Sequence, residues 1–396
     1  MSPLEAGRML DDTLLDDPAA LQRADRQHAL LALAGAGARV RTAVRLADEA
    51  GLVSLRPEGR PRTVLVAGHG SALAAGAVLA AVAVTACQVL PLGPSEAGPG
   101  EPDALTAGLV WQLPGWAGPL DLLVVSSATG RERGLVRLAE QAYARGCAIA
   151  VTAPPGSALA EAALQVRGLP LPYAPSAVEP GQSPDDEPDL PAEDPGAIWA
   201  HLAPLIALAD RIGVTQLPAG SLHGVADRLD EVAVRCRPDA AAYLNPAKGL
   251  AAQLSGTVPL VWADGPVPGA AAERFAAMLA DRAGLPALPG PLPQTLTAHR
   301  GMFVGHLGAG ADPDDFFRDR VDEPEPLQLQ VVLLRHAPGR PADADPGFAV
   351  ARARRLADAH DVRLTEYTST LEDPLQALAE LTGPADFAAV YLGLAR

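Results

Sequence analysis

Two apolar segments of the chain end in small hydroxyl residues. The first, TVLVAGHGSALAAG at 63–76, has a β-branched run that leads into Gly68, His69, Gly70 and Ser71. The second, LLVVSSATGRERG at 122–134, has an apolar run that leads into Ser126, Ser127 and Thr129. The N–H groups of a glycine turn and the start of a helix bind anions. Because parallel strands end at one edge of a sheet, the two segments together predict one site for a phosphate-bearing ligand.

Each of these residue types also has a purely structural role. Ser and Thr are favoured N-caps where a strand turns into a helix, so the four hydroxyl residues could do no more than cap helices. His69 either faces the ligand, as an acid or base that titrates near neutral pH, or is a solvent-facing imidazole. Arg131 and Arg133 either bind a phosphate through bidentate hydrogen bonds or lie on a solvated helix face. The residue types alone leave these alternatives open.

The residues around these segments alternate between strand and helix patterns. Strands are expected at 63–67, 87–92, 122–126, 148–152 and 165–169, with helices near 71–85, 131–145 and 157–164. A second alternating region has expected strands at 258–263, 302–305, 327–335 and 362–368. Its expected helices lie near 196–213, 221–233, 246–254, 269–283, 347–360, 371–382 and 386–395. This alternation predicts an α/β fold of two doubly wound halves with parallel sheets.

The same patterns divide the chain into a helical N-terminal lead-in, two α/β domains and a linker. The expected boundaries are 1–55 for the lead-in, 56–173 for the first domain, 174–196 for the linker and 197–396 for the second domain. The linker is rich in Pro, Asp and Glu and has almost no large apolar side chain, so it buries too little surface to offset the entropy of ordering. Its acidic residues at 185–194 are expected to be solvated, because their spacing fits no metal coordination shell.

Composition and charge exclude several classes of partner. Among 396 residues, 48% are hydrophobic and the formal net charge is −16, which disfavours nucleic acid and anionic membranes as partners. The apolar stretch at 72–86 is short and rich in Ala, so it predicts a buried crossover helix and not a membrane span. Cys87, Cys147 and Cys236 lack metal-ligand spacing, and the N-terminal residues show no apolar leader. A reduced, cytoplasmic protein is therefore expected.

A dinucleotide-binding protein is a weaker alternative for the glycine turn. Gly68 and Gly70 have no third glycine at the spacing that the dinucleotide fingerprint requires. The acidic residue that should follow about twenty residues later falls in the expected strand 87–92, which has no Asp or Glu. The sequence therefore favours a phosphate on a small molecule over a nicotinamide dinucleotide.

The order of these pieces resembles the sugar isomerase (SIS) fold, and specifically the bacterial and archaeal bifunctional phosphoglucose/phosphomannose isomerases. GHGSALAAG stands where that family has a Gly-x-Gly-Gly-Ser loop, and VSSATGRERG stands at its Ser-x-Ser-Gly-Asn-Thr-Glu-Glu loop. Five further pieces match in order: AVTAPPGSALAEAA, NPAKGL, AERFAAMLADRAGLPA, LPGPLPQTLTAH and DFAAVYLGLA. The likeness covers most of the chain, although each piece is individually loose.

This resemblance implies a phosphosugar-binding protein that interconverts fructose 6-phosphate with glucose or mannose 6-phosphate. In such an aldose–ketose isomerisation a carboxylate moves a proton between C2 and C1, and a His opens the sugar ring. The position of the family's catalytic carboxylate corresponds to Asp281. No His stands at the position of the family's His, and His299 follows that position by two residues. Lys248 of NPAKGL is expected near the phosphosugar. The resemblance implies neither a metal nor a cofactor, and it implies a homodimer.

Several departures from the family pattern concern the acid–base groups. Asp281 is one methylene shorter than the family's Glu, and a displacement of about 1 Å can cost on the order of a hundredfold in rate. Gln294 stands where the family has Glu, and the sequence ends at Arg396 before the segment in which the family carries a Lys. Asp281 and His299 could equally be a helix-terminal carboxylate and a loop imidazole. Two hypotheses follow: an isomerase with a degenerate catalytic set, or a non-catalytic regulatory protein that binds a hexose phosphate.

Overall fold

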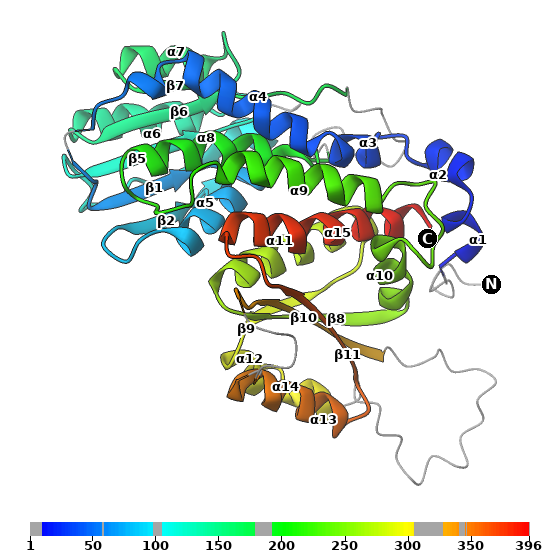
Figure 1. Ribbon diagram of the computed structural model, residues 1–396. Coiled ribbons are helices and arrows are strands. Elements are labelled where there is room, and N and C mark those ends of the chain that lie inside the picture. Colours follow the sequence, from blue (N-terminus) through cyan, green and yellow to red (C-terminus); the bar gives the residue numbers. More distant parts are fainter. Residues whose placement is uncertain are drawn as a thin grey trace, which may run out of the picture. The chain divides into compact units, whose positions relative to one another are not determined.

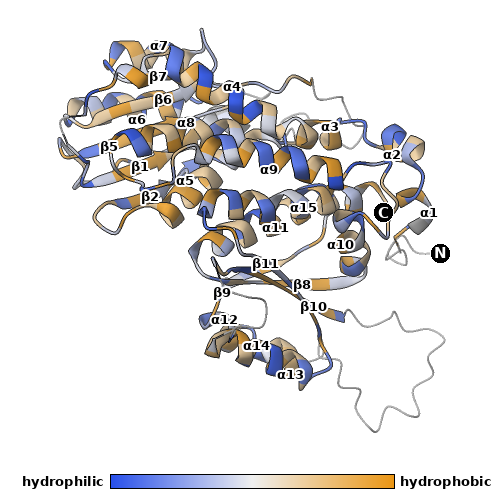
Figure 2. Ribbon diagram, viewed as in Figure 1, coloured by the Kyte–Doolittle hydropathy of each residue, from blue (hydrophilic) through white to orange (hydrophobic). Residues whose placement is uncertain are grey.

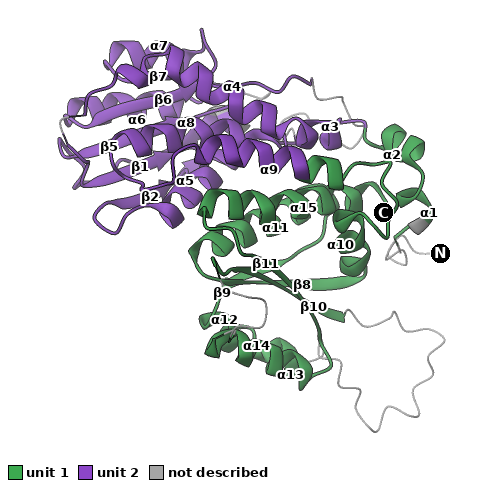
Figure 3. Cartoon of the chain, in the orientation of Figure 1, with its two compact units in different colours: residues 1–25, 232–396 green, residues 26–231 purple. Residues whose placement is uncertain are grey.

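The chain forms two compact units, which are coloured separately in Figure 3. The computed structural model describes residues 10–57, 59–97, 105–178, 192–304, 328–339, 345 and 347–395. One unit, called the C-terminal unit here, comprises 1–25 and 232–396, and the other, the N-terminal unit, comprises 26–231. These limits differ from the expected domain boundaries, because 197–231 groups with the first sheet and 1–25 groups with the second. Most of the expected linker, 179–191, lies outside the described residues.

The N-terminal unit is built on a five-stranded parallel sheet (Figure 1). The strands, in spatial order β2-β1-β5-β6-β7, are β2 (Gln88–Leu92), β1 (Thr63–Ala67), β5 (Asp121–Ser126), β6 (Ala148–Ala153) and β7 (Leu169–Pro172). Every residue of β1 and β5 is buried, as expected for the inner strands of a parallel sheet covered on both faces. The expected strand at 165–169 is displaced, because 158–165 forms a helix and the strand begins at Leu169.

Helices cover both faces of this sheet. They and the short elements are α3 (Ala29–Ala34), α4 (Ala36–Glu49), η1 (Leu52–Ser54), α5 (Ser71–Val82), η2 (Leu105–Gly108), α6 (Arg133–Ala144), α7 (Ala158–Gln165), α8 (Ala197–Arg211) and the first part of α9 (Ser221–Arg235). Strands β3 (Glu96–Ala97) and β4 (Leu109–Val110) form an antiparallel pair. Side chains of β1, β5 and β6 that include Leu65, Leu123 and Val151 pack with α6 and α7 in one core. Helix α5 packs on β1 and β2, and α8 packs on α4 and α5.

The near-continuous burial of α8 follows from its neighbours. Its sequence, AIWAHLAPLIALADR, has only three charged or ionisable side chains, two of which are its last two residues, and apolar residues also fill α5 (Figure 2). A helix that is apolar on all sides is stable where other elements cover it on all sides. Both α4 and α5 contact α8, so this helix brings interior side chains, His201 among them, close to the sheet.

The C-terminal unit is built on a four-stranded parallel sheet. The strands, in order β11-β10-β8-β9, are β11 (Arg363–Ser369), β10 (Gln328–His336), β8 (Thr257–Asp264) and β9 (Leu288–Pro291). Its helices are α1 (Asp12–Leu15), α2 (Pro18–Ala24), α10 (Pro246–Leu254), α11 (Pro266–Ala283), α12 (Gln294–Ala298), α13 (Arg300–Val304), α14 (Phe348–Asp358) and α15 (Pro374–Leu394). Phe303 of α13 and Val350 of α14 pack with Trp262 of β8 in one core, and α10, α11 and α15 pack together. Two parallel α/β sheets confirm the expected fold class.

Two of the predictions for the secondary structure of this unit are wrong. Residues 300–304 form helix α13, whereas a strand was expected at 302–305, of which Gly305 lies outside the described residues. The two helices expected at 371–382 and 386–395 are one helix, α15, with Pro384 inside it. Packing against α10 and α11 outweighs the backbone hydrogen bond that a proline removes from the ladder.

Candidate functional site

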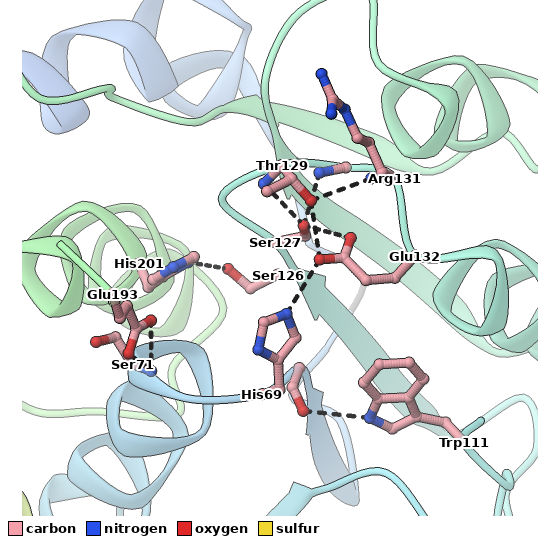
Figure 4. A network of polar contacts seen from close by, with 12 residues as sticks. His69, Ser71, Trp111, Ser126, Ser127, Thr129, Arg131, Glu132, Glu193 and His201 are labelled. Carbon is pink, nitrogen blue, oxygen red and sulfur yellow. Dashed lines mark hydrogen bonds and ion pairs between the residues drawn. The ribbon is translucent and has the colours of Figure 1, made fainter. Parts of the chain in front are cut away.

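The predicted hydroxyl residues and His69 meet at one edge of the N-terminal sheet. Strands β1 and β5 are neighbours, and the connections that leave their carboxyl ends run to helices on opposite faces of the sheet. A crevice outside the strand ends forms where connections diverge in this way, and ligands of open α/β sheets bind there. Figure 4 shows His69 and Ser71 after β1, Ser126 at the end of β5, and Ser127 and Thr129 after it.

Glu132 is the centre of the polar network at this edge. Its Oε1 accepts hydrogen bonds from His69 Nε2 at 3.0 Å and from Thr129 Oγ1 at 2.9 Å, and its Oε2 accepts one from Ser127 Oγ at 2.6 Å. Only 1% of the side chain is exposed. Burial raises the pKa of the carboxyl, but the hydrogen bonds from His69, Ser127 and Thr129 outweigh it and lower the pKa to about 2. Glu132 is therefore a buried, ionised carboxylate at neutral pH.

The loop after β5 also provides hydrogen-bond acceptors for its own backbone N–H groups. Ser127 Oγ accepts hydrogen bonds from the N–H groups of Thr129 at 3.1 Å and Gly130 at 2.7 Å. Gly130 has a φ of 65°, and a Cβ there would lie 2.2 Å from Ser157 Oγ, so the turn requires glycine. Two of the predicted phosphate ligands, Ser127 and Thr129, thus direct their hydroxyls to Glu132.

Ser126 faces the other side of the sheet. Its Oγ lies 2.7 Å from Nδ1 of His201, a residue of α8 that is 2% exposed. Burial lowers the pKa of His201 to about 3, so this imidazole is neutral throughout the physiological range. The contact joins the end of β5 to α8, and it leaves His201 without access to solvent.

Glu193 binds the N-terminal amide of α5. Ser71 N–H donates to both carboxylate oxygens of Glu193, at 2.9 and 3.0 Å, and the N-cap residue of this helix, Gly70, makes no side-chain cap of its own. Gly70 precedes it with a φ of 53°, and a Cβ on Gly70 would lie 2.7 Å from Glu193 Oε2. The unpaired amides of a helix N-terminus attract anions. The position predicted for a phosphate is therefore occupied by a carboxylate from the same chain (Figure 4).

The residue next to Glu193 anchors it. Asp194 forms an ion pair with Arg39 of α4. Arg39 also donates to the carbonyl of Ala174 at 2.9 Å and to the hydroxyl of Tyr173 at 2.8 Å. This corrects the expectation that all acidic residues of 185–194 are solvated, since Glu193 and Asp194 are half-buried and bonded. The ion pair of Asp194 with Arg39 ties the segment that carries Glu193 to α4.

His69 is a titratable member of this network with a ring nitrogen that is open to a ligand. Its side chain is 31% exposed, and its Nδ1 makes no hydrogen bond to any residue of the described ranges. The hydrogen bond that His69 donates to Glu132 raises the pKa of His69 in spite of burial. The imidazole is therefore fixed at Nε2 and available at Nδ1.

The acid–base residues predicted in the C-terminal unit have local partners. Asp281 of α11 forms an ion pair with Arg282 at 2.8 Å, and its side chain is exposed. His299, which follows α12, accepts a hydrogen bond at Nδ1 from Trp262 Nε1 at 3.1 Å, and burial lowers its pKa. No contact between Asp281 and His299 occurs among the described interactions, so their assignment as a catalytic pair stays a prediction.

Lys248, the single lysine of the chain, is buried at the start of α10. Its Nζ donates to the carbonyls of Pro238 at 2.7 Å and Ala240 at 2.8 Å, and it lies 5.6 Å from the centre of the Tyr391 ring. Burial lowers the pKa of Lys248. These contacts give the ammonium group a structural role in holding the turn before α10.

Replacing Lys248 by Met is expected to lower the free energy of unfolding by about 2–3 kcal/mol, because two half-buried carbonyls lose a charged donor. The affinity for a hexose phosphate is expected to stay within twofold of the unmodified chain. Urea denaturation and isothermal titration with fructose 6-phosphate measure the two effects. A tenfold loss of affinity in a folded Lys248→Met protein would instead assign the ammonium group to the ligand site.

The sequence did not identify three residues that organise this site, namely Glu132, Glu193 and His201. Glu132 lies within the second hydroxyl segment, where it is the nearest carboxylate to the loop hydroxyls and could have been considered as their acceptor. His201 and Glu193 reach the site from far along the chain and carry no local signal. Among the described residues, no group of His, Cys, Asp and Glu side chains could hold a metal ion, and no helix is both long and apolar enough to span a membrane.

Comparison with known proteins finds a similar domain family for the C-terminal part and a similar fold for the whole chain. Residues 244–396 match the family described as "Bacterial phospho-glucose isomerase C-terminal SIS domain". A search of curated protein sequences found no significant match. Tagatose-6-phosphate ketose/aldose isomerase from Escherichia coli is similar in structure, with a TM-score of 0.55 and 14% identity, over 94% of this chain and 92% of that one.

A second similar structure is the C-terminal domain of glucosamine-fructose-6-phosphate aminotransferase from Francisella tularensis. Its TM-score is 0.55 at 12% identity, over 93% of this chain and 96% of that one. At such low identity the likeness is one of fold alone. The fold of both units and the sequence of the second agree with the resemblance drawn from the motifs. Over residues 244–396 the chain is thus similar to the bacterial phosphoglucose isomerase C-terminal SIS domain family.

Proposed function

We propose that this chain is a phosphosugar-binding protein that holds a hexose phosphate at the carboxyl edge of the N-terminal sheet. The observation that carries the proposal is the carboxylate of Glu193 on the Ser71 amide, 2.9–3.0 Å away. An anion already occupies the helix N-terminus at the place where the motifs predict a phosphate. A phosphate group that replaces this carboxylate would make the same hydrogen bonds with a larger negative charge.

The family supports the same class of ligand. The two similar structures described above are named for enzymes of sugar phosphates, and the C-terminal part matches a phosphoglucose isomerase domain. In the proposed complex the phosphate lies on the α5 N-terminus, and the sugar extends past His69. Fructose, glucose and mannose 6-phosphate are the candidates that the resemblance implies.

In the catalytic version of the proposal, the protein isomerises the bound fructose 6-phosphate. The resemblance assigns the base that moves a proton between C1 and C2 to Asp281, ring opening to His299, and a place near the ligand to Lys248. The Asp281 side chain is exposed, so its carboxylate is accessible to a substrate. To reach that substrate, the carboxylate would have to leave its ion pair with Arg282. The catalytic version also implies a homodimer, because the sites of SIS proteins are commonly completed by residues of a neighbouring subunit.

A non-catalytic regulatory protein is the alternative, and specific contacts favour it. His299 Nδ1 is engaged by Trp262, and Lys248 Nζ is engaged by two carbonyls. With both groups held by the protein itself, the chain would sense a hexose phosphate without converting it.

A thermal shift measurement with the three hexose 6-phosphates tests the proposal. Each ligand that binds is expected to raise the melting temperature, by an amount equivalent to about 2.7 kcal/mol at a hundred times its Kd. Unphosphorylated fructose is the control and should have no effect. If none of the sugar phosphates shifts the melting temperature, the proposed function is wrong.

A coupled isomerase assay with fructose 6-phosphate separates the two forms. Turnover that disappears in the Asp281→Asn protein would establish the isomerase. Binding without turnover would establish the regulatory form.

A further inference from the structure

We propose that His69, oriented by Glu132, is the group that opens and closes the ring of the bound sugar phosphate by transferring one proton between the anomeric hydroxyl and the ring oxygen. This inference rests on the proposed function, because it requires a sugar phosphate at this edge of the sheet. It moves the ring-opening role from His299, whose Nδ1 is bonded to Trp262, to His69, whose role as an acid or base the residue types alone left open.

The first argument is the arrangement of the two side chains. Glu132 is buried and accepts from His69 Nε2 at 3.0 Å, so it fixes the proton of the neutral imidazole on Nε2 and the orientation of the ring. Nδ1 is then an acceptor, and it has no hydrogen-bond partner within the described parts of the chain. A carboxylate that orients a histidine whose second nitrogen is open is the arrangement by which enzymes position a general base.

The second argument is the position of His69. It lies between the end of β1 and Ser71, whose amide is the anion site, and its open nitrogen points away from Glu132 in Figure 4. A ligand with its phosphate on that amide has its sugar close to the imidazole. The titratable groups that face His69 are Glu132 after β5, Glu193 before α8 and His201 of α8.

The third argument is that the other titratable groups of the site are not available for proton transfer. Glu132 is 1% exposed, and its two oxygens accept three hydrogen bonds. His201 is fully enclosed and bonded to Ser126. Glu193 is the anion that the phosphate replaces. His69 is the remaining group of this network with an exposed, unbonded ring nitrogen.

The balance of protons decides which step a single imidazole can perform. In ring opening, Nδ1 takes the proton of the anomeric hydroxyl, whose oxygen forms the carbonyl as the bond between the anomeric carbon and the ring oxygen breaks. The ring oxygen then takes the proton from the imidazolium, and His69 returns to its starting state. Removal of a proton from carbon would also need a second group to protonate the carbonyl oxygen, and this network supplies none. Ring opening is therefore the step that the geometry supports.

The test measures the exchange of the two cyclic anomers of fructose 6-phosphate by NMR, with protein at catalytic concentration. The unmodified protein is expected to accelerate exchange above the spontaneous rate, and the effect should increase with pH as His69 loses its proton. His69→Gln is expected to reduce the accelerated rate by at least a hundredfold while the affinity measured by titration stays within threefold. His223→Gln, at an exposed position of the same unit, is the matched control and should keep the full rate.

Glu132→Gln distinguishes a positioning role from a structural one. Without the carboxylate, the pKa of His69 falls, so the rise of the exchange rate should move to lower pH in the Glu132→Gln protein. A purely structural residue would change the stability and leave the pH profile in place. If His69→Gln fails to fold, the pH profiles of the unmodified and Glu132→Gln proteins still test the proposal.

Three outcomes would overturn the inference. Exchange that His69→Gln leaves unchanged would remove His69 from the reaction. Binding of fructose 6-phosphate by the unmodified protein without faster exchange at any pH would refute the ring-opening role and leave the proposed function standing. Absence of binding by the unmodified protein would refute the proposed function itself.

Discussion

Replacement of Glu193 by Gln is expected to tighten the binding of fructose 6-phosphate, on the order of a hundredfold. In the unmodified chain the ligand must displace a carboxylate that lies 2.9–3.0 Å from the Ser71 amide. Two unit charges 4 Å apart repel by about 4 kcal/mol at an effective dielectric constant near 20, and each 1.4 kcal/mol changes an affinity about tenfold. Rotation of the Glu193 side chain away from the site and screening by salt reduce the expected gain in affinity to about a hundredfold.

Isothermal titration of both proteins with fructose 6-phosphate measures the change. Glu140→Gln is the matched control, because Glu140 is an exposed carboxylate of α6 and its loss changes the net charge by the same amount. The control is expected to bind within twofold of the unmodified chain. Equal affinities of the Glu193→Gln protein and the unmodified chain would mean that the phosphate does not occupy the α5 N-terminus.

Replacement of Glu132 by Gln is expected to lower the free energy of unfolding by about 3 kcal/mol at pH 7. The pKa of this carboxyl falls from its ordinary 4.5 to about 2 in the folded protein, and each pKa unit corresponds to about 1.4 kcal/mol. An amide cannot accept three hydrogen bonds, so at least one of the His69, Ser127 and Thr129 donors loses its partner. Urea denaturation of the two proteins measures the difference, with Glu140→Gln again as the control.

The pH dependence gives this prediction a second readout. Because the folded pKa of Glu132 lies below its unfolded value, its contribution is present above about pH 4.5 and is lost as the pH falls toward 2. The pKa of His69 is raised, so its contribution is present below its ordinary 6.5 and is lost as the pH rises through the folded pKa. The pair therefore stabilises most between these limits. The difference between unmodified and Glu132→Gln proteins should shrink at pH 3, and an equal difference at pH 3 and 7 would contradict this assignment.

Most elements of the fold were predictable from local patterns. Inner strands of a parallel sheet are buried on both faces, so β1 and β8 read as apolar runs, and the positions expected for them are confirmed within one residue at either end. The errors occurred where local patterns are ambiguous. A run as short as 302–304 does not distinguish helix from strand, and Pro384 predicted a break that tertiary packing overrides.

The sequence by itself determined which residues meet at the carboxyl edge of the first sheet. His69 and Ser71 come shortly after β1 and Ser126 ends β5, and strand order in a doubly wound sheet brings such positions together. Their type and spacing therefore predicted the location of a candidate anion site and the class of ligand.

Only the tertiary structure decided what those residues bind. The acceptor of the loop hydroxyls is Glu132, and the anion on the Ser71 amide is Glu193, a residue 122 positions later in the chain. The partner of Ser126 is His201, 75 positions away. Side-chain hydrogen bonds depend on atoms within about 3 Å, whereas sequence patterns record periodicity along one element. Contacts between distant segments therefore become visible only when the helices and strands have packed.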